Sequence, residues 1–214
     1  MQTRKLFTVS AIAILTAGAV SAENVLRWTS QGDALTMDPH SQNEGPTMAM
    51  NGQFYEALVT RDEAMLLKPE LASSWTSAPD GWTFNLRKGV KFHDGADFTA
   101  EDVVFSFNRA KHEASDYKEQ AKNVVSVEVI DDHTVKLLPD GPHPILPNQL
   151  SDLFIMDSGW AKANNVENPQ DFAGKEETFA VRNANGTGPF VLGSRAPDEM
   201  TVLTRNANWW GNDM

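Results

Sequence analysis

Apolar and polar residues alternate most clearly in residues 81–92, GWTFNLRKGVKF. Trp82, Phe84 and Leu86 fall on one face of an extended chain, with polar residues between them. A period of two is the pattern of a half-buried β-strand. The pair at 88–89 contains glycine and follows the run directly, so we predict a strand that ends in a turn.

Three further stretches predict strands. Residues 127–138 carry two β-branched runs on either side of Asp131 and Asp132, which is typical of a β-hairpin. Residues 179–206 contain two or three short apolar runs separated by Asn, Gly and Pro turns. Residues 24–33 begin with apolar residues and end in Gly-Asp, which predicts a short strand that opens into a loop.

Helical spacing occurs near residue 50. Met50, Phe54 and Leu58 recur every four residues, with Pro46 near the first turn, where its missing N–H is harmless, so a helix of about a dozen residues is expected. Residues 142–147 hold three prolines, a density that excludes a regular helix or a central strand there. Helices and strands are interspersed, so the fold class is mixed α/β.

The stretch KFHDGADFTAEDV, residues 91–103, is dense in charge. Asp94-Gly95 is a favoured turn pair, because Asp bonds its own backbone and Gly accepts positive φ. Thr99 followed by Asp102 predicts a capping box at the start of a helix. The expected helix carries an apolar stripe of Val103, Phe107 and Ala110.

The charges that a helix start does not explain are those of His93, Asp94 and Asp97. They could form a catalytic or metal site, but no second histidine stands at helical spacing from His93. The sequence also lacks a Gly-x-Ser-x-Gly elbow, a phosphate-binding Gly-x-x-x-x-Gly-Lys loop and a His-Glu-x-x-His motif. A structural turn is the favoured interpretation.

The first 22 residues predict an export signal. Arg4 and Lys5 precede an apolar run that is too short to span a bilayer, and small residues lead to a cleavage site after Ala22. Cleavage would change the net charge from −11 to −13. An acidic protein of this kind is a poor partner for nucleic acid, and the absence of cysteine excludes thiolate chemistry.

Several stretches together resemble one family, the bacterial extracellular solute-binding proteins of family 5, which are the peptide- and nickel-type receptors of ABC importers. The strand, His-Asp-Gly turn and Thr-x-Glu-Asp-Val helix start occur together as the signature region of that family. The resembling stretches are YEALVTRD (55–62), KPELASSW (68–75), DGWTFNLRKGVKFHDGADFTAEDVVFSF (80–107), VEVIDDHTVKL (127–137), NGTGPFVL (185–192) and NANWWG (206–211).

The resemblance implies a periplasmic binding protein of type 2, with a mixed-sheet lobe and an inserted smaller α/β subdomain. Residues 23–65 and 181–214 would form the discontinuous first lobe and residues 66–180 the insertion. Members of the family are more than twice as long, so we expect this chain to be truncated and to lack the second lobe. A monomer without a cofactor is expected, delivering a solute to the permease subunits of an ABC transporter.

The function implied by the resemblance is binding of an oligopeptide, a dipeptide or a similar small solute. The tryptophans Trp28, Trp209 and Trp210 are candidates for the wall of a pocket. Two alternatives stay open: a secreted hydrolase that uses His93, Asp94 and Asp97, and a structural or chaperone-like surface protein. The candidate ligand-binding residues are Ser30, Gln31, Gly32, Asp33, Leu35, Gly188, Pro189 and Phe190.

Overall fold

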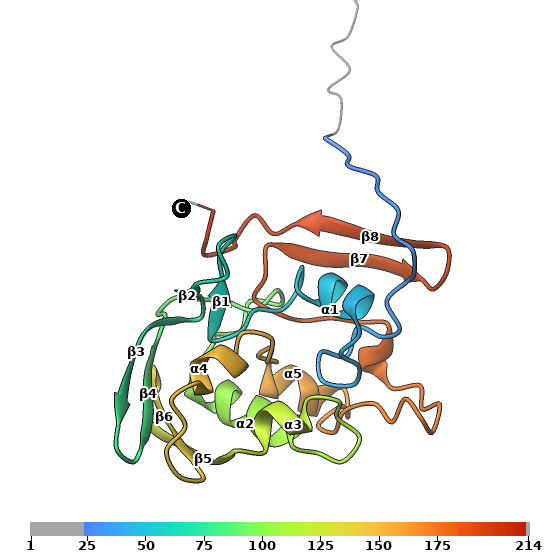
Figure 1. Cartoon of the computed structure of the whole chain (residues 1–214). Coiled ribbons are helices and arrows are strands. Elements are labelled where there is room, and N and C mark those ends of the chain that lie inside the picture. Colours follow the sequence, from blue (N-terminus) through green and yellow to red (C-terminus); the bar gives the residue numbers. More distant parts are fainter. Residues whose placement is uncertain (1–23, 213–214) are drawn as a thin grey trace, which may run out of the picture.

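The computed structural model describes residues 24–212, with eight strands and six helical segments (Figure 1). The predicted export signal, residues 1–22, lies outside the described residues. The strands are Val59–Arg61 (β1), Leu67–Pro69 (β2), Ala72–Ala78 (β3), Gly81–Leu86 (β4), Val124–Asp131 (β5), Thr134–Pro139 (β6), Phe190–Ala196 (β7) and Met200–Arg205 (β8). The helices are Gly45–Asn51 (α1), Ala100–Ala110 (α2), Lys118–Ala121 (α3), Leu146–Gln149 (α4), Ser158–Ala163 (α5) and the 3-10 turn Phe179–Val181 (η1).

An antiparallel sheet of order β3-β4-β6-β5 forms the largest layer. The strand predicted in residues 81–92 is β4, and its alternate residues Phe84 and Leu86 are buried. The hairpin predicted in residues 127–138 is β5–β6, paired from Asp131↔Thr134 outward with two register shifts, at Val129/Asp131 and Val124/Ser126. Both predictions are confirmed. Each strand pairs with a strand that is close to it along the chain, so the local sequence pattern was sufficient to predict it.

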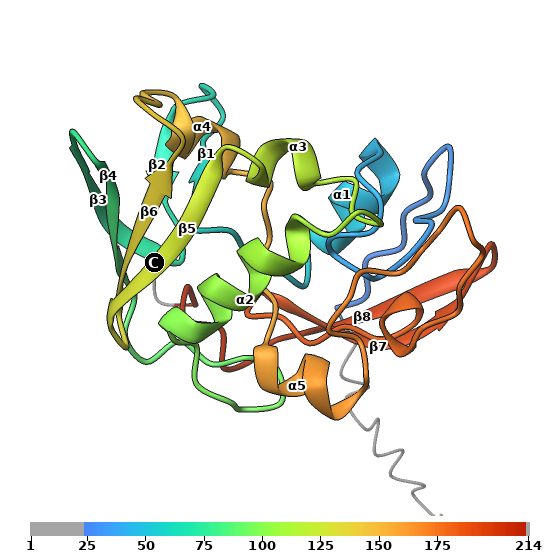
Figure 2. The same ribbon diagram turned by 90° about the horizontal axis from the view of Figure 1, so that it is seen from below.

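Two smaller hairpins, β1–β2 and β7–β8, complete the strands of the described chain. The four-stranded sheet lies on one side of α2, and α1 and the β7–β8 hairpin lie on the other (Figures 1 and 2). The segment 179–206 contains β7, β8 and the 3-10 turn η1, in agreement with the two or three short strands that were predicted there.

Helix α2 starts as its sequence predicts. Thr99 is the N-cap, and its side chain and that of Asp102 form the capping box. The Thr99 N–H donates to Asp102 Oδ2 at 2.9 Å. Val103, Phe107 and Ala110 are buried against the sheet core, so the apolar stripe is confirmed and α2 is fixed as the central helix.

The helix predicted through Met50, Phe54 and Leu58 is wrong in its extent. α1 ends at Asn51, because the chain turns at Gly52 and Phe54 already lies in a loop. Phe54 and Leu58 are buried all the same. Tertiary packing, and not helical periodicity, buries these two side chains.

The proline-rich segment needs a smaller correction. α4 is a single helical turn that begins in the last two residues of this segment, and Pro147 stands at the start of that turn, where a missing N–H costs nothing. The prolines exclude a longer helix but not one turn.

The strand predicted at the beginning of residues 24–33 is wrong. Residues 24–30 form no strand, and Val25, Leu26 and Trp28 are more than half exposed. A strand needs a neighbour for its backbone N–H and C=O groups, and no described strand pairs with this segment. The loop that follows it is present.

Candidate ligand-binding loop and its buried anchor

The loop of residues 30–35 is tied to the tip of the β7–β8 hairpin through Asp33. Its Oδ1 accepts a hydrogen bond from Arg195 Nη1 at 3.1 Å, and its Oδ2 accepts one from the Asp198 N–H at 2.8 Å. Partial burial acts to raise the pKa of Asp33, but these donors outweigh burial and lower it. Asp33 is therefore an ionised anchor that holds a surface loop on a hairpin 162 residues further along the chain.

The other predicted residues of this loop present side chains or backbone to the surface. Ser30 Oγ donates to the Gly32 carbonyl at 2.6 Å, which tightens the turn. The Leu35 N–H donates to Thr47 Oγ1 at 2.8 Å, while the Leu35 side chain is 44% exposed. Gln31 is exposed. An ordered loop with free polar edges and one exposed apolar side chain has the composition of a ligand-contacting surface.

Gly188, Pro189 and Phe190 lie elsewhere. The Gly188 N–H donates to the Phe54 carbonyl at 2.8 Å, and a Cβ at Gly188 would stand 2.8 Å from the Gln53 carbonyl oxygen. Glycine is needed here for close approach of two backbones. Gly188 and Pro189 precede β7, and Phe190 is its first residue. Asp33 binds Arg195 near the other end of β7. Five residues of strand, at about 3.3 Å each, separate Phe190 from Arg195 by roughly 16 Å. The structure does not bring the two predicted groups into contact.

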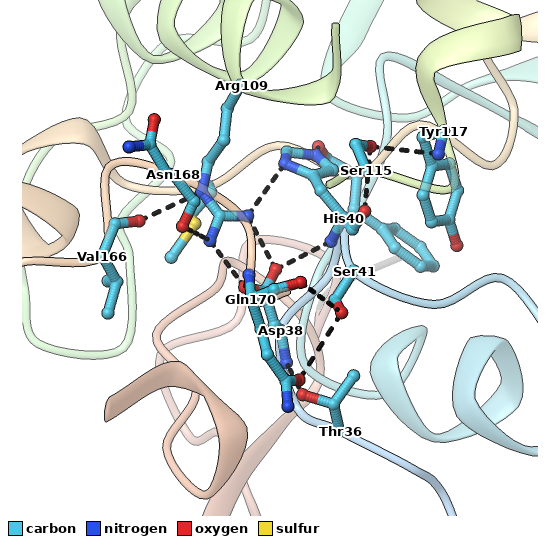
Figure 3. Close-up of polar contacts among 12 residues, drawn as sticks. Thr36, Asp38, His40, Ser41, Arg109, Ser115, Tyr117, Val166, Asn168 and Gln170 are labelled. Atoms are coloured by element: carbon cyan, nitrogen blue, oxygen red, sulfur yellow. Dashed lines mark hydrogen bonds and ion pairs between the residues drawn. The ribbon is translucent and has the colours of Figure 1, made fainter. Parts of the chain in front are cut away.

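Directly after the loop, the chain enters a buried ionic network (Figure 3). Asp38 and Arg109 have side chains that are 0% exposed and form a two-pronged pair, with Nη1–Oδ1 at 2.6 Å and Nη2–Oδ2 at 2.7 Å. Asp38 also accepts from the N–H groups of His40 and Gln170. Burial acts to raise the pKa of Asp38, but the charge and hydrogen bonds of Arg109 outweigh it and hold the pKa below its ordinary value.

His40 completes the network as a neutral ring. Arg109 can only donate, so the contact from its Nη1 to His40 Nδ1 at 3.2 Å makes Nδ1 an acceptor. The proton is then on Nε2, which donates to the Phe154 carbonyl at 2.8 Å. Burial first, and then the charge of Arg109, lower the pKa of His40 to about 4.

The network fixes segments that are far apart in the sequence. Arg109 also donates to the carbonyls of Val166 and Asn168, and Ser115 Oγ donates to the His40 carbonyl at 2.9 Å. Both oxygens of Asp38 are already occupied by two donors each. With no free lone pair and no solvent access, this cluster is an anchor for the loop and not a reaction centre.

The His93 turn is a structural clamp. His93 Nε2 donates to the Gly188 carbonyl at 3.1 Å, and its Nδ1 accepts from the Gly186 N–H at 3.3 Å. Burial lowers the pKa of His93, against the hydrogen bond to Gly188 and the charge of Asp94, which act to raise it. Asp94 caps its own turn through Ala96. Asp97 pairs with Lys91 at 2.5 Å, so the three residues do not converge on a substrate position.

The two C-terminal tryptophans share one buried carboxylate. Trp209 Nε1 and Trp210 Nε1 donate to Glu56 at 2.9 and 2.7 Å. Trp210 lines a surface hollow of about 590 Å³, whereas Trp209 and Trp28, the other two candidates for a pocket wall, do not line it, and Trp28 is 55% exposed. A second hollow of about 300 Å³ lies beside Arg195, between Trp160, Phe179 and Arg182.

Sequence reasoning missed Asp38, His40 and Arg109. Arg109 is buried in α2 on the side of Asp102 and Ser106, outside the stripe of Val103, Phe107 and Ala110, so no local pattern marked it as an arginine that needs a buried acid. The identity of that acid, 71 residues away, had no local signal. Among residues 24–212 no group of three His, Asp or Glu side chains could hold a metal ion, and no helix is long and apolar enough to cross a bilayer.

Comparison with known proteins gives a consistent result. The sequence model of the family described as "Bacterial extracellular solute-binding proteins, family 5 Middle" matches residues 67–214. The glutathione-binding protein GsiB of Escherichia coli O6:K15:H31 is 31% identical over 206 residues, which are 94% of this chain and 38% of that protein. The chain therefore spans well under half the length of the relatives that it matches.

Solved structures agree with this match. The periplasmic binding protein DppA of Helicobacter pylori, in complex with the peptide STSA, is 29% identical with a TM-score of 0.70, covering 84% of this chain and 38% of that one. NikZ of Campylobacter jejuni, in complex with Ni(L-His), is 25% identical with a TM-score of 0.72, covering 84% and 35%. The mixed α/β fold is that of part of a type 2 periplasmic binding protein.

Proposed function

Because this chain belongs to the bacterial extracellular solute-binding proteins of family 5, we propose that it is the substrate-binding part of an ABC importer. Its ligand is a peptide or a similar small solute, which it delivers to permease subunits in the membrane. It acts in the periplasm after an export signal at residues 1–22 is removed. Residues 23–65 and 181–214 belong to one lobe, and residues 66–180 form an inserted subdomain.

The observation that carries this proposal is the anchoring of the 30–35 loop. Asp33 fixes the loop from one side, and the Asp38–Arg109 pair fixes the segment that follows it. A loop that is ordered before the ligand arrives loses less conformational entropy on binding. We propose that Ser30, Gln31, Gly32 and Leu35 contact the ligand. The first three offer polar groups, and the Leu35 side chain offers an apolar surface.

The Gly188–Phe190 segment has a supporting role in this proposal. His93 and Phe54 hold this segment through hydrogen bonds, which fixes the start of β7. Arg195, which binds Asp33, lies further along the same strand. We propose that the chain performs no catalysis: both ring nitrogens of His93 are occupied by backbone groups.

The direct test is native mass spectrometry of the protein purified from its own periplasm, followed by titration calorimetry with the solute that is found. Glutathione, a tetrapeptide and a nickel–histidine chelate are the first probes. An Asp33→Ala variant should weaken binding at least tenfold in a protein whose circular dichroism shows that it still folds, with a lower melting temperature because the nearly buried Arg195 loses its carboxylate. Asp140→Ala, the same substitution at an exposed acid, is the matched control. Saturable binding that Asp33→Ala leaves intact would contradict the assignment of the loop.

A further inference from the structure

A hollow of about 590 Å³ opens where the end of the four-stranded sheet meets the C-terminal tryptophans. It is separate from the 30–35 loop, and none of the residues assigned to the solute lines it. Its wall combines basic, hydroxyl and aromatic side chains. The lining residues are Ser73, Asn85, Leu86, Arg87, Lys88, Val90, Asp131, His133, Thr134 and Trp210.

Arg87 is held in one orientation in this wall. Its Nε donates to the Glu70 carbonyl, and its guanidinium carbon stands 4.2 Å from the ring centroid of Trp210. Trp210 is itself fixed, because its Nε1 donates to Glu56 at 2.7 Å. A planar guanidinium that is stacked and tethered through Nε keeps its fork pre-organised for a planar anion.

The donors of this wall are not used within the described chain. Among residues 24–212, neither terminal nitrogen of Arg87 makes a hydrogen bond, and no carboxylate oxygen lies within 4.0 Å of a nitrogen of Arg87 or Lys88. His133 Nδ1 is buried and has no partner in that range either. The acid of the wall, Asp131, accepts from the His133 N–H at 2.8 Å. Arg87 and Lys88 thus meet at a hollow whose one lining acid, Asp131, forms no ion pair with either of them within 4.0 Å.

We propose that this hollow is a carboxylate-binding site. The carboxylate lies on the fork of Arg87, with Lys88 beside it, and the carbon chain of the ligand extends along the part of the wall that Leu86 and Val90 line. Arg is suited to this because two parallel N–H···O bonds match the two oxygens of a carboxylate. The size of the hollow is in the range of small-molecule sites.

Two sources can supply this chemistry: a free organic acid, or an aspartate or glutamate side chain of a polypeptide. Titration calorimetry on the 214-residue chain separates them, with glutarate as the first probe. A peptide with blocked termini and one internal glutamate is the second. Saturable binding of either probe at low ionic strength, weakened by added salt, is the expected result, and the probe that binds identifies the source.

Lys88→Glu is the principal variant, because Lys88 is exposed and its loss leaves the fold intact. It should weaken binding at least tenfold. Lys68→Glu, the same charge change on exposed β2, should leave it unchanged. Arg87→Lys keeps the charge but loses the fork, and should weaken binding by a similar factor in a protein whose circular dichroism is unaltered.

Three outcomes overturn the proposal: neither probe saturates, Lys88→Glu binds as the unmodified chain does, or Lys68→Glu is equally impaired. Asp33→Ala should leave this binding unchanged. If it abolishes binding of glutarate, the probe occupies the 30–35 loop and the separate site is wrong. If Arg87→Lys unfolds, Lys88→Glu and the salt dependence still decide.

Discussion

Asp38 is a fully buried and Glu70 a partly buried carboxyl group, and their pKa values shift in opposite directions. Asp38 lies against Arg109 and accepts four hydrogen bonds, so its pKa is lowered in spite of complete burial. Glu70 accepts one hydrogen bond, from the Ala57 N–H. Burial first, and the charge of nearby Glu56 second, raise the pKa of Glu70 to about 8.

The difference shows that burial alone does not decide the charge state of a carboxyl group. The number of donors and the contact with a cation decide it. Asp38 remains ionised and serves as an anchor between distant segments. Glu70 carries a proton at neutral pH, so the region around Glu56, Arg87 and Trp210 holds one negative charge fewer than its composition suggests.

The largest expected effect comes from breaking the Asp38 pair. Arg109→Met leaves a buried carboxylate without its cation and should lower the free energy of unfolding by about 3–5 kcal/mol. Urea denaturation measures it. Arg182→Met, at an exposed pair with Glu177, is the control and should cost less than about 1 kcal/mol. A double variant, Asp38→Leu with Arg109→Met, should recover part of the loss, and a small effect of Arg109→Met would contradict the anchor.

Glu70→Gln tests the other side of the comparison. Between pH 4.5 and about 8 the unfolded chain releases the Glu70 proton while the folded chain keeps it, so folding stability falls as pH rises through this window. The slope is at most about 1.4 kcal/mol per pH unit. In Glu70→Gln the fall should become shallower, because the contribution of Glu70 is removed while Glu56 and Asp157, whose pKa values burial also raises, still contribute. Denaturation midpoints across this range measure the change. The same substitution at exposed Glu63 should leave the slope intact; an unchanged slope in Glu70→Gln would refute the raised pKa.

His40 should produce the opposite slope at lower pH. Its pKa is lowered to about 4, so between pH 6.5 and 4 the unfolded chain binds a proton that the folded chain does not. Stability is lost as pH falls through this window. The ring Cε1 proton of His40, followed by NMR, should keep the shift of a neutral imidazole down to about pH 5. A titration midpoint above 6 would show that Nδ1 does not accept from Arg109.

The smallest effect concerns Asp102, a buried carboxylate held by neutral donors alone in the described chain. It accepts from the Thr99 and Ser158 N–H groups at 2.9 and 3.0 Å and from Thr99 Oγ1 at 3.3 Å. Thr99→Ala removes the hydroxyl and should cost about 1 kcal/mol in thermal unfolding. Thr76→Ala on exposed β3 is the control. Equal losses in the two variants would argue against a capping box.

The sequence by itself determined the features whose partners are close along the chain. The period of two gives β4 and the β5–β6 hairpin, and Thr99 with Asp102 gives the start of α2. Family membership followed from the same signature region. In each case the interacting groups are a few residues apart, so the local pattern already contains both of them.

Only the tertiary structure decided which distant residues meet. Asp38 and Arg109 are 71 residues apart, and Glu56 and Trp210 are 154 apart. Nothing in a local pattern distinguishes Asp38 from an exposed acid, because Arg109, the cation that keeps Asp38 ionised, belongs to helix α2. The absence of a strand in residues 24–30 has the same cause, since a strand exists only where a neighbour accepts and donates its backbone hydrogen bonds.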